Sequence, residues 1–187
     1  LAMIAGFIFL RLRGILGKRT GFEGKVTPQF EEVIKKINKI DKPEKTQENF
    51  DDDAQKEFLK GAKIAYETII TDFSDNDNKI VESKSLLNNK IYSQFNEALK
   101  ARSSRGHHAE ITFIGINSAT IKEHKKIGNI LNVTVNFIAE VITCIKDKDK
   151  KIVSGDPEKI KKIYDTWVFS RDTTSLNPNW QLVNILT

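Results

Sequence analysis

The sequence predicts an α+β domain in which helices pack on one face of a strongly curved antiparallel sheet. Apolar residues recur at helical spacing in the first part of the chain, whereas residues 110–186 are rich in β-branched and aromatic side chains. Between residues 131 and 145, apolar side chains alternate with polar ones, which is typical of an antiparallel sheet with one covered face. With 187 residues, of which 39% are hydrophobic, the chain can bury one core.

The N-terminal end combines an apolar run with basic residues. Residues 1–10 carry no charge and are followed directly by RLRGILGKR. A spanning helix needs about 20 apolar residues, so we expect this run to end a longer single anchor. The basic flank would place the rest of the chain on the cytoplasmic side of the inner membrane. An interfacial amphipathic helix, a core helix and a signal peptide are the alternatives. We expect membrane contact, mainly with anionic phospholipid, through these side chains: Phe7, Phe9, Arg11, Leu12, Arg13, Lys18 and Arg19.

The next segments join this end to the folded domain. Val26, Phe30, Val33 and Ile37 recur at helical spacing and predict an amphipathic helix, whereas residues 41–53 are polar, acidic and interrupted by Pro43. We therefore expect three parts: a membrane anchor with its basic flank in residues 1–25, a helix and acidic linker in residues 26–52, and a pocket domain in residues 53–187.

Two helices are predicted at the start of the domain. The first spans about residues 53–72 and has Phe58, Tyr66 and Phe73 on one face. The second spans about residues 79–102, where an apolar residue recurs at every fourth position: Leu87, Ile91, Phe95 and Leu99.

Strands are predicted in residues 110–121, 129–145, 152–154, 163–171 and 180–186. The lysine-rich segments 122–128 and 146–151 would connect them. Helices followed by a meander of strands are typical of the α+β class. A strongly curved sheet closed by helices commonly leaves an apolar pocket.

Three segments carry a resemblance to a known family. Residues 165–185, DTWVFSRDTTSLNPNWQLVNI, resemble the C-terminal signature of the family named after subunit forty-four of the mitochondrial inner-membrane translocase. GAKIAYETII and FNEAL match the same family, and RLRGILGKRTG resembles the juxtamembrane motif of its bacterial, membrane-anchored members. We interpret the signature as mostly structural, with aromatic core residues and an Asn-Pro turn between strands. Its residues are Trp167, Phe169, Arg171, Asn177, Pro178 and Trp180.

The resemblance implies a cone of the nuclear-transport-factor-two-like class with an apolar pocket, for which the candidates are Tyr66, Phe95, Phe137 and Trp167. It also implies a non-catalytic adaptor in protein translocation or membrane-protein biogenesis, with the translocation or insertion machinery as its partner. The alternative is a small-molecule- or lipid-binding pocket protein, or an enzyme of the same fold that uses Glu140 as its pocket carboxylate.

The sequence contains no phosphate-binding glycine loop, paired metal-ligand motif or nucleophile elbow. We therefore expect no cofactor, no metal and no catalytic residue. The three histidines should lie on the surface, and Cys144, the single cysteine, should be a buried, inert thiol. The net charge of +5 is a mild basic bias. The lysine clusters lack interleaved aromatic residues, so we expect solvated loops and no nucleic-acid partner.

Overall fold

The computed structural model describes residues 50–74 and 79–186, so the predicted anchor and the amphipathic helix after it lie outside the described residues. The described part holds two α-helices, one short 3-10 helix and a four-stranded antiparallel sheet, which confirms the α+β class. In chain order the elements are α3 (Asp52–Ser74), η1 (Lys84–Leu86), α4 (Asn89–Ser104), β1 (His108–Ile127), β2 (Ile130–Lys146), β3 (Ile152–Asp172) and β4 (Gln181–Leu186).

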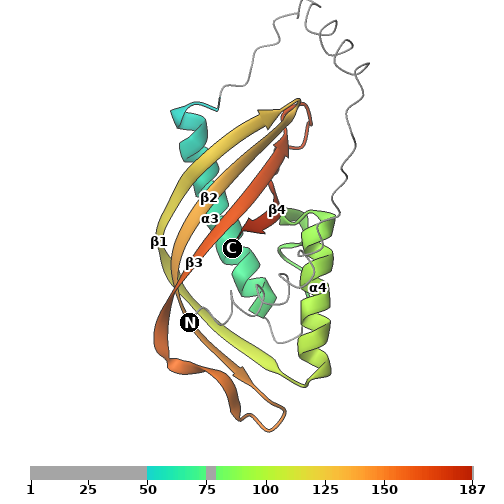
Figure 1. Ribbon diagram of the computed structural model, residues 1–187, viewed down its shortest axis with the longest axis vertical. Coiled ribbons are helices and arrows are strands. Elements are labelled where there is room, and N and C mark those ends of the chain that lie inside the picture. Colours follow the sequence, from blue (N-terminus) through green and yellow to red (C-terminus); the bar gives the residue numbers. More distant parts are fainter. Residues whose placement is uncertain (1–49, 75–78, 187) are drawn as a thin grey trace, which may run out of the picture.

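The sheet is a simple meander with the strand order β1-β2-β3-β4. Its three long strands bend round α3, and α4 lies beside α3 near the short strand β4 (Figure 1). The turn between β1 and β2 lies at the end of the molecule where α3 begins, whereas the turn between β2 and β3 lies at the opposite end (Figure 1). The sheet therefore has two distinct ends.

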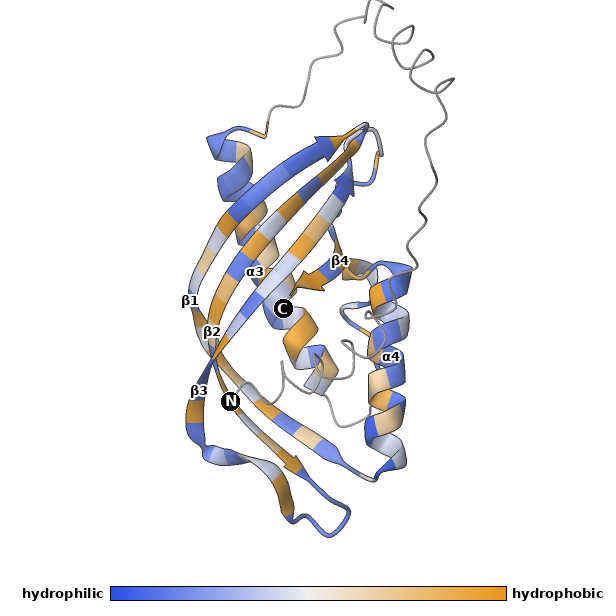
Figure 2. Cartoon of the chain, in the orientation of Figure 1, coloured by the Kyte–Doolittle hydropathy of each residue, from blue (hydrophilic) through white to orange (hydrophobic). Residues whose placement is uncertain are grey.

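Both helices begin at a side-chain cap. The Asp51 carboxylate accepts a hydrogen bond from the backbone N–H of Ala54 at 2.9 Å, and the Asn88 side chain accepts one from that of Ile91. Apolar bands recur along each helix (Figure 2) and face the core. The start predicted for the second helix at residue 79 is wrong, because α4 begins at Asn89. The Asp72 carboxylate holds the backbone of residues 81–83 in a loop instead.

Two segments outside the predicted strands, residues 122–127 and 155–162, belong to strands. Residues 122–127 continue β1, because a turn at Gly128 and Asn129 pairs them with the start of β2, where Lys126 lies opposite Leu131. Residues 155–162 continue β3, so the two strands predicted there are one. The strand predicted to start at Trp180 starts one residue later.

The core lies between α3, α4 and the inner face of the sheet. Along β2 every second residue from Leu131 to Val141 is buried, as the alternation in the sequence predicts. The inner-face residues of β2 are Leu131, Val133, Val135, Phe137, Ala139 and Val141.

Candidate functional site

Aromatic side chains from four elements, α3, α4, β2 and β3, pack in the centre of the domain. The ring of Tyr66 from α3 stacks on Phe137 from β2, with centroids 4.3 Å apart, and lies 4.6 Å from Trp167 of β3. Phe95 from α4 packs against Phe73, with centroids 5.0 Å apart. All four side chains predicted to line a pocket are therefore buried, and three of them contact one another.

A single carboxyl group lies within this aromatic centre. The hydroxyl of Tyr66 donates a hydrogen bond to Oδ2 of Asp165 at 2.5 Å, and both residues are buried. Asp165 is on the inner face because Ile163, Asp165 and Trp167 alternate along β3. Burial raises the pKa of the Asp165 carboxyl, which the hydrogen bond from Tyr66 partly offsets. Burial, followed by the neighbouring carboxylate, raises the pKa of the Tyr66 phenol well above its usual range.

A second aromatic cluster lies where α3 begins. Trp180 packs on Phe58 with ring centroids 4.5 Å apart, and Phe58 also contacts Phe169 at 5.9 Å. The guanidinium of Arg171 lies over the Trp180 ring at 5.3 Å. Phe50 closes the cluster through contacts with Phe58 and Trp180. Four of the six signature residues are buried or half-buried: Trp167, Phe169, Arg171 and Trp180. Of these, Trp167, Phe169 and Trp180 contact aromatic side chains of α3.

The other two signature residues, Asn177 and Pro178, are exposed in the loop between β3 and β4. The Asn177 side chain accepts a hydrogen bond from the backbone N–H of Asn179 at 3.0 Å. Asp172 accepts bonds at the start of this loop from the backbone N–H and the hydroxyl of Thr174, which lower the pKa of its carboxyl. Asn177 and Pro178 therefore lie in a turn.

Residues 31–187 match the family described as Tim44-like domain. The chain belongs to this family. The mitochondrial import inner membrane translocase subunit TIM44 of Mus musculus is 26% identical over 96 residues, which cover 50% of this chain and 21% of that protein. The probable subunit tin-44 of Caenorhabditis elegans is 26% identical over 160 residues, which cover 84% of this chain and 35% of that protein. The chain thus spans about a fifth and a third of the lengths of these relatives.

A solved structure, the intermembrane space region of the chloroplast protein ARC6, is also similar, with a TM-score of 0.41 and 11% identity. The match covers 69% of this chain and 96% of that one.

The remaining candidates in the Tim44-like domain lie outside the aromatic centre. The Glu140 carboxylate accepts a hydrogen bond from the Asn117 amide at 3.2 Å and lies 3.7 Å from Nζ of Lys162, on the outer face of the sheet. Cys144 is buried, and burial raises the pKa of its thiol. Among residues 50–74 and 79–186, no group of three or more His, Cys, Asp or Glu side chains is placed to hold a metal ion. In the same residues, no helix is long and apolar enough to cross a membrane.

Two residues of these clusters were not predicted from the sequence. Asp165 stands in the apolar alternation of Ile163, Trp167 and Phe169, and this pattern could have revealed a carboxyl in the core. Phe50 lies in a polar segment that reads as a linker, and the sequence carries no signal that it packs against the domain.

Proposed function

We propose that this chain is a non-catalytic adaptor that works at the inner membrane, on its cytoplasmic side. Residues 1–25 anchor it, residues 26–52 connect the anchor, and residues 53–187 bind a component of the protein-translocation or membrane-insertion machinery. The observation that carries this proposal is the match to the Tim44-like domain over residues 31–187, together with curated relatives that are translocase subunits.

The packing of the domain supports a binding role over an enzymatic one. The rings of Tyr66, Phe137 and Trp167, three of the four pocket candidates, pack against one another in the core. Glu140, the candidate carboxylate of the enzyme alternative, pairs with Lys162 on the other face of the sheet. A partner protein needs only an outer surface. A cone with a ligand-binding pocket remains the alternative to an adaptor.

Crosslinking in the native cells, followed by purification of the full-length chain, tests the adaptor role. We expect translocation or insertion components among the crosslinked proteins. Ribosomal proteins would indicate a tether for ribosomes instead. A metabolite that the purified protein converts would replace the adaptor with an enzyme.

The proposed membrane contact has its own test. Each basic residue near an anionic surface contributes about 1 kcal/mol, so Arg11, Arg13, Lys18 and Arg19 together contribute about 4 kcal/mol before screening by salt. A peptide of residues 1–40 should bind anionic vesicles in a salt-sensitive manner. Replacing these four residues with glutamine should weaken that binding strongly. Equal binding to neutral vesicles would contradict the electrostatic part of the proposal.

A further inference from the structure

Exposed aliphatic side chains gather on two neighbouring loops at one end of the sheet. Ile127 and Ile130 pair with each other across the turn between β1 and β2, and they are 60% and 40% exposed. Leu176, in the loop between β3 and β4, is fully exposed. The two loops are joined, because the backbone N–H and the hydroxyl of Thr173 donate hydrogen bonds to the carbonyl oxygen of Asn129 at 2.8 and 3.0 Å. We call Ile127, Ile130 and Leu176 the apolar tip.

Leu176 stands in a loop that hydrogen bonds shape on both sides of it. The Asp172 carboxylate accepts bonds from the backbone N–H of Thr174 at 2.8 Å and from its hydroxyl at 2.7 Å. The Ser175 hydroxyl accepts a bond from the backbone N–H of Asn177 at 3.1 Å. Single exposed apolar residues are common on protein surfaces. Three of them on joined loops at the extremity of a domain fit an interaction surface better.

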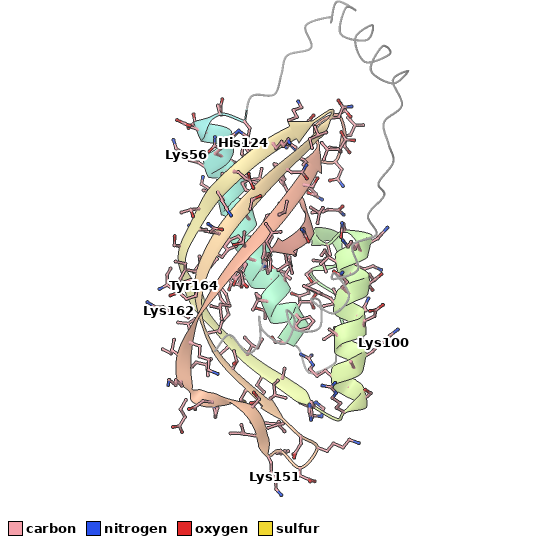
Figure 3. The ribbon with its side chains drawn as sticks, viewed as in Figure 1. Lys56, Lys100, His124, Lys151, Lys162 and Tyr164 are labelled. Carbon is pink, nitrogen blue, oxygen red and sulfur yellow. The ribbon has the colours of Figure 1, made fainter. Side chains whose placement is uncertain are left out.

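The preceding chain joins the domain at this same end. The ring of Phe50 lies 5.1 Å from the imidazole of His124 near the end of β1, and 6.1 Å from Trp180 in the loop that carries Leu176. Figure 3 shows His124 at this end and Lys151 at the opposite one. Residues 1–49, with the anchor proposed in residues 1–25, therefore connect to the domain beside the apolar tip. This end of the domain is therefore the one joined to the segment that we propose to enter the membrane.

The residues around the tip fit a lipid surface. Residues 122–130 contain three lysines and one glutamate, so the exposed Ile127 and Ile130 lie next to a basic strand end. Asp51, Asp52 and Asp53 at the start of α3 oppose a purely electrostatic contact with anionic lipid. Apolar insertion therefore has to supply much of the binding energy. A protein pocket would accept the same side chains, but it offers no reason for their position beside the anchored end.

We propose that the apolar tip inserts into the lipid surface to which the N-terminal segment is anchored, and that this second contact fixes the orientation of the domain. The inference rests on the proposed membrane attachment of residues 1–25. In this orientation the turn between β1 and β2 faces the membrane, and the turn between β2 and β3 points away from it (Figure 1).

A spin label at position 176 tests the insertion directly. The full-length chain would carry Cys144→Ala and Leu176→Cys, and a matched protein would carry Lys100→Cys, because Lys100 lies on α4 away from the tip (Figure 3). Both would be mixed with vesicles of equal parts phosphatidylcholine and phosphatidylglycerol. We expect the label at 176 to become accessible to oxygen and protected from a water-soluble nickel reagent. The label at 100 should stay in water.

Substitutions at the tip give a second measurement on the full chain. Ile127→Thr, Ile130→Thr and Leu176→Ser should each weaken vesicle binding up to about tenfold. Ile160→Thr is the matched control, because Ile160 is 53% exposed on β3 outside the tip, and it should leave binding unchanged.

The possible failures are distinguishable. If the full chain sediments with the vesicles while the label at 176 stays in water, the tip does not insert, although the proposed anchor holds. If the full chain does not bind vesicles at all, the membrane attachment and this inference are both wrong. If the label at 176 is shielded only after a protein fraction of the native membrane is added, the tip binds a protein and the inference is overturned.

Discussion

Replacing Asp165 with asparagine should change how the stability of the domain depends on pH. Burial raises the pKa of this carboxyl, so the folded protein holds a proton that the unfolded chain releases near the ordinary aspartate pKa of about 3.9. The stabilisation that this bound proton gives the folded state is complete below about pH 3.9 and is lost as the pH rises through the folded-state pKa of Asp165. Within this window the free energy of unfolding falls by about 1.4 kcal/mol per pH unit. Asparagine has no such dependence.

The measurement is urea unfolding of the wild type and Asp165→Asn, followed by tryptophan fluorescence because Trp167 adjoins the Tyr66–Asp165 pair. In Asp165→Asn, the buried side-chain NH₂ group adds a hydrogen-bond donor. Burying this donor lowers the stability by about 1 kcal/mol at every pH. The stability of Asp165→Asn relative to wild type should therefore rise from about pH 4 upward and level off at the folded-state pKa. Tyr66→Phe should extend the window upward, because it removes the bond that lowers the Asp165 pKa.

Glu110→Gln is a control of opposite sign. The hydrogen bond from Lys146 lowers the pKa of the Glu110 carboxyl, so its contribution is present above the unfolded pKa and is lost as the pH falls. The stability of Glu110→Gln relative to wild type should therefore fall as the pH rises through that range. If the difference in stability between Asp165→Asn and wild type did not change as the pH rose above about 4, burial would not raise the Asp165 pKa, and the reasoning would fail.

Four further outcomes follow from the packing. Trp180→Ala should lower the free energy of unfolding measured in urea by about 2 kcal/mol, because it removes the half-buried ring that packs on Phe58 and Phe50. Gly155→Ala should lower the free energy of unfolding by more than about 2 kcal/mol, because φ is +87° and the new Cβ would clash with the backbone carbonyl oxygen of Thr143. Gly128→Ala is the matched control and should cost about 1 kcal/mol, because the new Cβ would meet open space. Equal costs at the two positions would contradict the clash at Gly155. Asp72→Ala should cost about 3 kcal/mol by removing the acceptor for the loop at residues 81–83, and a thermal melt near wild type would argue against this. Residues 51–187 should melt at the same temperature with and without a chelator, and a large drop would reveal a structural metal.

The sequence alone determined which residues face the core in the regular parts of the domain. In α3 the helical spacing of Phe58, Tyr66 and Phe73 predicted its buried face, and in β2 the alternation predicted the inner face. This works because the side-chain period of a helix or strand is a local property, and each buried position must be apolar or paired. The segment around Trp167 and Trp180 indicated the family through its resemblance to a known signature, and its tryptophans pack against aromatic neighbours.

Only the tertiary structure decided which segments pair. Residues 122–127 are polar and lysine-rich, yet they form a strand because the start of β2 supplies hydrogen-bond partners that composition does not record. The hydrogen bond between Tyr66 and Asp165 joins residues 99 positions apart in the sequence. Phe50 and Trp180, which pack on each other, are even farther apart along the chain. Local patterns specify the face on which a side chain lies. The partner it meets there depends on strand order, register and curvature, which arise only when the whole chain folds.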